Sequence, residues 1–187
     1  MEEEAKFCIE VAGEKMEKAL RHLEDELAHV RAGKASPNIL DGITVDYYGA
    51  ITPLSQVSNI GTPDAKTIVI QPWDKSMIDT IEKAILYANI GLTPMNNGEI
   101  IRLNIPPLTE ERRRNLVKQV KNMGENTKVS IRNARRDANE ELKKLLKAGL
   151  PEDIEIESVD EVQKLTDSHI HKTDIIVVAK EKEIMTV

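Results

Sequence analysis

Hydrophobic residues in the first 32 positions recur at steps of three and four. They are Ile9, Ala12, Met16, Leu20, Leu23, Leu27 and Val30. This spacing places them on one face of an α-helix. Gly33 favours the left-handed conformation that ends helices, and Pro37 biases Ser36 away from the helical region. The pattern predicts a first helix of about 30 residues, roughly 45 Å long.

The pattern changes between residues 33 and 106. Three short β-branched runs are separated by turn-forming Gly, Pro, Asn and Asp residues. The runs are 43–47, 67–70 and 100–105. Before the last run, residues 77–88 have helical spacing, and Asp74 or Ser76 can cap that helix. This part of the chain is therefore predicted to form a small domain of strands and one helix.

Helical spacing returns after Pro106 and Pro107. Thr109 is expected to cap this second helix, because a hydroxyl at that position can accept a hydrogen bond from a free backbone N–H group. Hydrophobic residues then recur about every 3.6 residues as far as Ala148. Gly149 is expected to end the helix.

A third helix is predicted to begin at Ser158, where Glu161 completes a capping box. The predicted fold class is α+β. Residues 1–32 and 107–187 form a long antiparallel three-helix bundle, and residues 33–106 form an inserted β/α/β domain. Because two neighbouring segments join the domains, we expect hinges near 33–37 and 105–107. The hinge residues are Gly33, Ser36, Pro37, Pro106 and Pro107.

The composition predicts a cytoplasmic protein with a mainly aliphatic core. Aromatic residues make up 3% of the chain, and Cys8 is the one cysteine, which excludes an internal disulfide or a cysteine zinc cluster. The N-terminal residues lack the basic and apolar regions of a signal peptide, and the longest apolar run is Ile175–Ala179. We therefore expect no membrane span.

The net charge of −6 conceals one basic segment. Residues 106–150 contain 12 basic and 6 acidic residues, whereas the segments on either side are acidic. On a helical projection, eight cations of the second helix lie within about 60° of one line, away from the hydrophobic stripe. We call these residues the basic face: Arg114, Lys118, Lys121, Lys128, Arg132, Arg135, Arg136 and Lys143.

The basic face predicts binding to the phosphate backbone of folded RNA, with a steep dependence on salt. The alternative is a solvated face that pairs with the acidic first and third helices. Three arginines within five residues favour RNA, because a guanidinium can make two parallel hydrogen bonds to one phosphate. No aromatic residue lies on this face, so we expect recognition of RNA shape and backbone rather than stacking on unpaired bases.

Sequence motifs of enzymes are absent: the chain has no phosphate loop, no dinucleotide-binding glycine motif, no nucleophile elbow and no zinc-protease motif. His22 and His29 lie about 10 Å apart along the first helix and are expected on the surface. His169 and His171 point about 160° apart, which prevents chelation. Cys8 has no histidine near it in sequence. The sequence predicts no catalytic residue, no cofactor and no metal site.

Five parts of the sequence carry a further signal: Arg31-Ala-Gly-Lys-Ala-Ser-Pro37, Leu40-Asp-Gly-Ile with Val45-Asp-Tyr-Tyr-Gly49, Pro106-Pro-Leu-Thr-Glu-Glu-Arg-Arg113, Arg132-Asn-Ala-Arg-Arg-Asp-Ala-Asn139 and Asp160-Glu-Val-Gln-Lys-Leu-Thr166. In order and over the whole chain, they resemble the motifs of the ribosome recycling factor family. The resemblance implies an L-shaped molecule that imitates the outline of a transfer RNA. It also implies a monomeric, non-enzymatic translation factor that enters the intersubunit space of the ribosome after termination. With elongation factor G and GTP, such a factor promotes dissociation into subunits for a new round of initiation.

The resemblance also implies which residues bind the ribosome. Arg132 and Arg135 become the principal contacts to large-subunit ribosomal RNA. Together with the basic face, this gives a predicted site of Arg31, Lys128, Arg132, Arg135 and Arg136. Many members of the family have arginine where this chain has Lys34, which keeps the charge but loses the forked geometry. The GTP chemistry is implied to belong to elongation factor G, in agreement with the missing phosphate loop.

Two other classes of function stay open. In the first, the charged helices bind a protein partner or a second copy as a coiled-coil adapter, although a short third helix and the inserted domain fit this poorly. In the second, the chain is an enzyme with unfamiliar motifs. An adapter would sediment as an oligomer, whereas the expected translation factor is a monomer that co-sediments with ribosomes.

Overall fold

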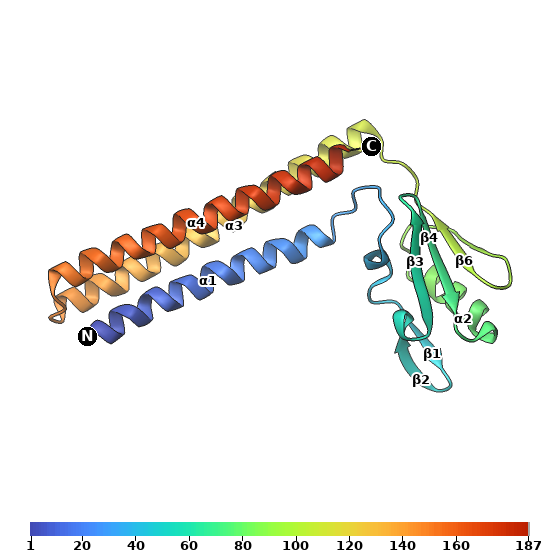
Figure 1. The fold of residues 1–187 in the computed structure, drawn as a ribbon, viewed down its shortest axis with the longest axis horizontal. Helices are drawn as coiled ribbons and strands as arrows, with labels where there is room; N and C mark the ends of the chain where they lie inside the picture. The colour runs from blue at the N-terminus through green and yellow to red at the C-terminus, as the bar shows by residue number, and fades with distance from the viewer. Residues whose placement is uncertain (187) are drawn as a thin grey trace. The chain divides into compact units, whose positions relative to one another are not determined.

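The computed structural model describes residues 1–186. The chain divides into two compact units, one formed by Met1–Val30 with the residues from Glu111 onward and the other by Arg31–Glu110 (Figure 1). The first unit is a three-helix bundle and the second contains all the strands of the described chain. This confirms the predicted α+β class, a helical bundle with an inserted β/α/β domain. Within residues 1–186, no helix is both long enough and apolar enough to cross a membrane.

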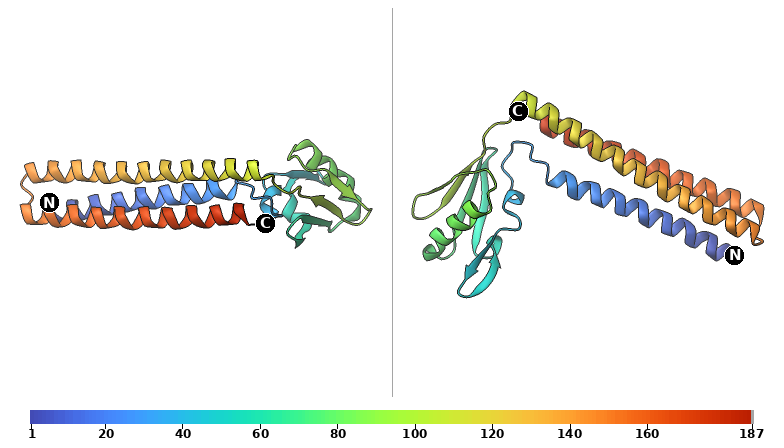
Figure 2. Two further views of the ribbon diagram at one scale, coloured as in Figure 1. Left: turned by 90° about the horizontal axis from the view of Figure 1, so that it is seen from above. Right: turned by 180° about the vertical axis from the view of Figure 1, so that it is seen from behind.

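The bundle consists of α1 (Glu2–Ala28), α3 (Glu110–Lys147) and α4 (Glu152–Met185). The three helices lie side by side, and α3 runs antiparallel to the other two (Figure 2). Each helix contributes fully buried aliphatic or thioether side chains to the bundle core. Examples are Met16, Leu23, Ile131, Leu142, Val162 and Ile184. The spacing of three and four residues in the sequence therefore becomes the buried side of each helix.

The predicted start of the third helix at Ser158 is wrong, because α4 begins at Glu152 after Pro151 at the N-cap. Ser158 is buried, and its hydroxyl donates to the carbonyl oxygen of Ile154 at 2.7 Å, four residues earlier in the same helix. Thr166 and Thr173 behave alike. Ser158 and Glu161 match a capping box in the sequence, which placed the predicted start of the helix too late in the chain. At 34 residues, α4 is not short.

Gly124 lies buried where α3 approaches α4. A Cβ atom at this position would lie 2.6 Å from Cγ2 of Val177, well inside normal contact distance. Glycine in the middle of a helix costs about 1 kcal/mol relative to alanine. Here the missing side chain allows the two helices to pack closely.

The inserted unit contains one four-stranded antiparallel sheet, one hairpin and one helix. The strands are β1 (Thr44–Tyr47), β2 (Ala50–Pro53), β3 (Ser58–Asp64), β4 (Thr67–Pro72), β5 (Pro94–Asn96) and β6 (Ile101–Asn104), and the helix is α2 (Ile78–Tyr87). The sheet order is β3-β4-β6-β5, and β1 pairs with β2. Isoleucines of α2, β4 and β6 form a separate hydrophobic core. The side chain of Asp74 accepts a hydrogen bond from Ser76 N and so caps the short helical turn Lys75–Met77 directly before α2. Helix α2 itself follows Met77 without a side-chain cap, so the predicted cap belongs to this turn and not to α2.

The two segments that join the units contact each other within the inserted unit. Gly33 has a φ of +73°, and a Cβ atom there would lie 2.8 Å from Cγ of Leu108. Ser36 caps the short helical turn Pro37–Leu40, because its hydroxyl accepts a hydrogen bond from Asn38 N. Glycine at position 33 is thus required both by its backbone conformation and by the close approach of Leu108. Movement at these segments stays a prediction.

Candidate nucleic-acid interface

The basic face lies along α3, which contains 38 residues and is about 57 Å long. Six of its eight cations are exposed, and the other two, Lys128 and Arg135, are half-buried. The opposite side of α3 is occupied by the bundle core, including Val120, Ile131 and Leu142. The core therefore fixes the direction in which the cations project.

Of the two arginines predicted to be the principal RNA contacts, Arg132 and Arg135, Arg132 has the more exposed side chain. Its side chain is exposed, and neither a hydrogen bond nor an ion pair joins it to another of residues 1–186. Arg136 is also exposed, and its Nη2 donates to Oδ1 of Asn133 at 2.6 Å. Because an amide oxygen carries no formal charge, this contact leaves the positive charge of Arg136 uncompensated.

Arg135 lies at the border between α3 and α4. Its Nη1 donates to Oε1 of Gln163 on α4 at 3.3 Å. Nε2 of Gln163 in turn donates to Oδ1 of Asp167 at 2.9 Å. The guanidinium of Arg135 is therefore held by a neutral group, and the nearest carboxylate in this chain of hydrogen bonds is one side chain further away.

Lys128 lies on the same border and is held differently. Its Nζ lies 2.5 Å from Oδ1 of Asp174 and 3.4 Å from Oε1 of Glu125. The hydrogen bond and the charge of Asp174, with a smaller contribution from Glu125, raise the pKa of Lys128 above its ordinary value. Its charge is therefore balanced within the bundle. At this position the structure has the pairing expected of a solvated face.

Arg31 does not belong to the basic face, because it lies in the inserted unit. It is exposed, and its Nη1 donates to the carbonyl oxygen of Ile90 at 2.8 Å. Lys34, on the same connecting segment, is half-buried. The structure thus brings Lys128, Arg132, Arg135 and Arg136 together on one helix and places Arg31 in the other unit.

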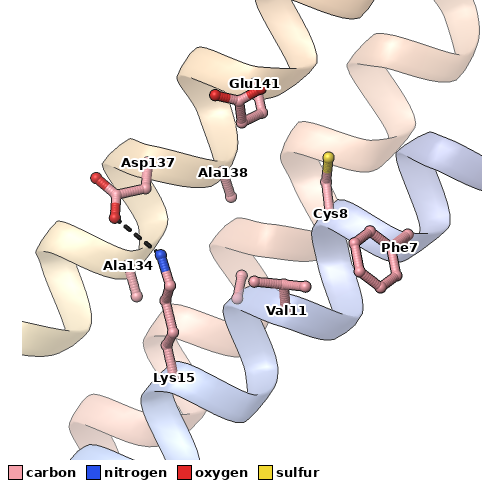
Figure 3. A pocket seen from close by; sticks show the side chains of 9 residues that line it. Phe7, Cys8, Val11, Lys15, Ala134, Asp137, Ala138 and Glu141 are labelled. Atoms are coloured by element: carbon pink, nitrogen blue, oxygen red, sulfur yellow. Dashed lines mark hydrogen bonds and ion pairs between the residues drawn. The ribbon is translucent and has the colours of Figure 1, made fainter.

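A pocket of about 240 Å³ lies between α1 and α3 (Figure 3). Its lining includes Phe7, Cys8 and Glu141, and an ion pair of 3.1 Å joins Lys15 and Asp137 across it. Partial burial, followed by the charges of Glu141 and Glu4, raises the pKa of the Cys8 thiol. A protonated thiol is a poor nucleophile, and no histidine lines the pocket. The pocket therefore offers no assembled catalytic group.

The histidines occupy structural or surface positions. His22 and His29 are exposed, as predicted. His169 is buried, with Nδ1 2.7 Å from the carbonyl oxygen of Leu165 and Nε2 3.3 Å from Oε2 of Glu17. Within residues 1–186, no group of three or more His, Cys, Asp or Glu side chains is arranged to hold a metal ion.

Two polar residues of α4 that sequence reasoning did not assign to the site contact the basic face, Gln163 and Asp174. Gln163 lies inside the stretch Asp160–Thr166, one of the motifs of the family resemblance. Membership of this motif was the one feature of the sequence that could have pointed to Gln163 as part of the site. Asp174 belongs to none of these motifs, and its contact with Lys128 depends on how α3 and α4 pack.

Comparison of the sequence with known proteins identifies close relatives. The family model described as ribosome recycling factor matches residues 23–185. The ribosome-recycling factor of Porphyromonas gingivalis is 58% identical over 185 residues, which cover 98% of this chain and 100% of that protein. The ribosome-recycling factor of Flavobacterium johnsoniae is 55% identical over 187 residues, which cover 100% of both chains.

Solved structures agree with the sequence comparison. A solution structure of the ribosome recycling factor is similar with a TM-score of 0.81 and 39% identity, and the match covers 98% of each chain. A second match has a TM-score of 0.63 and 43% identity, and it covers 97% of this chain and 99% of the other. It comes from models for the T. thermophilus ribosome recycling factor and the E. coli elongation factor G bound to the E. coli post-termination complex. This chain therefore belongs to the ribosome recycling factor family, a family of translation factors that are not enzymes, as the sequence predicted.

Proposed function

We propose that this chain binds the post-termination ribosome in the cytoplasm as a monomer and, with elongation factor G and GTP, promotes its dissociation into subunits. The family supports the ribosome as partner, and the second solved relative is bound with elongation factor G to a post-termination complex. One observation carries the assignment of the surface. Arg132 is exposed without a partner among residues 1–186, and its neighbours Arg135 and Arg136 bond to neutral amides.

The residues Arg132–Arg136, which we call the arginine segment, have a chemistry that suits large-subunit ribosomal RNA. A phosphate backbone attracts cations whose charge is not balanced locally, and binding releases condensed counterions. The bundle core holds α3 as a long rod, so that the arginines keep fixed spacings along the RNA. Recognition then depends on the shape and backbone of the RNA, because no aromatic side chain lies on the basic face.

The inserted unit supplies the mechanical step in this proposal. Elongation factor G, using GTP, moves this unit on the connecting segments that contain Gly33, Ser36, Pro37, Pro106 and Pro107, and the movement disrupts contacts between the ribosomal subunits. The chain itself contributes binding and rigidity. It has no phosphate-loop motif, so nucleotide hydrolysis is assigned to elongation factor G.

Co-sedimentation with ribosomes over a salt series tests the proposal. The double variant R132A/R135A is expected to lose affinity and to lower the slope of log K against log salt by about 1.5. The control K6A/K172A removes two exposed cations from α1 and α4 and is expected to keep nearly the wild-type slope. Equal behaviour of the two double variants would show that only overall charge matters. A coiled-coil adapter would instead sediment as an oligomer without ribosomes.

A further inference from the structure

We propose that Gln163 and Asp167 are positioning residues for Arg135, which together fix its guanidinium on the basic face without neutralising it. This inference rests on the proposed function, because it assigns a role to Arg135 in RNA binding. The two residues lie four positions apart on α4, so their side chains meet on one side of that helix. Gln163 accepts a hydrogen bond from Arg135 of α3, and Asp167 is linked to Arg135 through Gln163.

The directions of the two hydrogen bonds follow from the chemistry of the groups. An ionised carboxylate only accepts hydrogen bonds, so Asp167 must receive the N–H of the Gln163 amide at 2.9 Å. A guanidinium only donates, so Arg135 must face the amide oxygen, 3.3 Å away. Asp167 thus sets the orientation of the amide, and the amide presents its oxygen to Arg135. A flipped amide would place two donors against each other.

The choice of an amide has an electrostatic consequence. At Lys128 the contacting group is a carboxylate of α4, because Asp174 contacts the cation directly. At Arg135 the contacting group is neutral, and the carboxylate of Asp167 lies behind it. Among residues 1–186, the side chain of Arg135 uses one of its five N–H donors, which leaves the others for a bidentate contact with phosphate.

Fixing the side chain favours binding as well. A long side chain loses rotamer freedom when it binds, and one that already has its bound conformation loses less. Arg135 is half-buried between helices and tied to α4, whereas Arg132 has no such restraint among residues 1–186. Arg135 is therefore the arginine of the pair that is oriented before the RNA arrives.

An exchange of the two polar groups tests this role. The double variant Q163E/D167N keeps the net charge, the side-chain lengths and a hydrogen bond between positions 163 and 167, but it places the carboxylate against Arg135. Ribosome affinity in the co-sedimentation assay is expected to fall on the order of tenfold, the loss expected for R135A. The slope of log K against log salt is expected to fall by about 0.7 to 0.9.

A second variant separates orientation from charge. Q163M fills a similar volume but replaces the amide oxygen by a thioether, which is at most a weak acceptor, so Arg135 keeps its charge and loses most of its restraint. Affinity is expected to fall by a smaller factor, and the salt slope is expected to stay at the wild-type value. In an R135A background, both Q163M and the exchange variant are expected to have no further effect, which a merely structural role of α4 would not produce.

The possible outcomes separate failure of the positioning role from failure of the proposed function. If R132A and R135A weaken binding but the exchange variant binds like the wild type, Gln163 and Asp167 have no positioning role and the proposed function stands. If the effects of Q163M and R135A simply add, the inference is also overturned. If neither R132A nor R135A weakens binding, the proposed RNA surface fails and the inference fails with it. Thermal unfolding of each variant monitors the fold.

Discussion

Two regions of the same helix face differ in how their cations are held. Around Lys128, two carboxylates contact the ammonium group and its charge is balanced inside the bundle. One to two turns further along α3, the arginine segment Arg132–Arg136 meets only neutral amides or no partner among residues 1–186. A row of cations in a sequence is therefore not one uniform surface. The part that can attract RNA is the part that the protein does not neutralise.

The largest expected difference between the regions is in ribosome affinity. Loss of one contact between a charged side chain and a phosphate costs about 1.4 kcal/mol or more, which is about tenfold in affinity. R132A/R135A removes two such contacts and is therefore expected to weaken binding about 100-fold. K128A is expected to weaken it far less, because Asp174 already occupies that ammonium group. Equilibrium binding to ribosomes at one salt concentration measures both. Equal losses per cation would abolish the distinction.

The packing of α3 against α4 near Lys128 can be altered at Gly124 without changing any charged residue. G124A inserts a methyl group 2.6 Å from Val177 Cγ2, and overpacking of this kind costs about 1–3 kcal/mol, partly offset by about 1 kcal/mol of helix propensity. We expect a net loss of about 1 kcal/mol in the free energy of unfolding, measured by urea denaturation. The matched variant G124A/V177A is expected to recover part of the loss. Ribosome affinity of G124A is expected to stay near the wild-type value, and a large drop would mean that the arginine segment depends on this packing.

Release of Lys128 is expected to make its region resemble the arginine segment. D174N removes the contacting carboxylate, so the slope of log K against log salt is expected to become steeper by up to about 0.9. E157Q is the control, because it removes the same charge from an exposed position on α4. If the two variants gave the same slope, Asp174 would act through general charge and not through its contact with Lys128.

The smallest expected effect is in the pH dependence of stability. The pKa of Lys128 is raised above about 10.5 in the folded protein, mainly by Asp174. The protonated form is therefore favoured by folding, and the contribution of the pair is full below the unfolded-state value and is lost as pH rises through the folded-state pKa. Urea denaturation of wild type and K128M is expected to differ by a constant amount from pH 7 to about 10 and to converge above that. A difference that persists in strong alkali would exclude the ion pair as its cause.

Sequence periodicity was sufficient for the regular parts of the fold. The sequence predicted a helix that follows a cap at Thr109 and continues to Ala148, and α3 is observed as Glu110–Lys147, because its apolar stripe is nearly uninterrupted. Strand β3 was missed, since Gly61 and Pro63 lie within it and most of its side chains are exposed. The beginning of α4 was missed because Ser158 with Glu161 matches a capping box, whereas the Ser158 hydroxyl is buried inside the helix and bonds to Ile154 O. In each case the error lies where a residue type and its environment disagree.

The exposed or paired state of each cation could not be predicted in the same way. A helical projection places Lys128 and Arg132 on one face but says nothing of the neighbouring helix. Which residue of α4 reaches which cation depends on the register between the two helices, and that register involves close contacts such as Gly124 with Val177. The sequence therefore predicted the basic face and left open which of its members the bundle neutralises.

Directed cleavage of ribosomal RNA tests most directly whether the arginine segment lies against it. Cys8 is replaced by serine, and a single cysteine that carries iron–EDTA is placed at Val129, an exposed position three residues before Arg132, or at Glu14, an exposed position on α1. Hydroxyl radicals generated from position 129 on the ribosome are expected to cut large-subunit RNA strongly, and those from position 14 weakly or elsewhere. Strong cleavage from position 14 with none from position 129 would contradict the account.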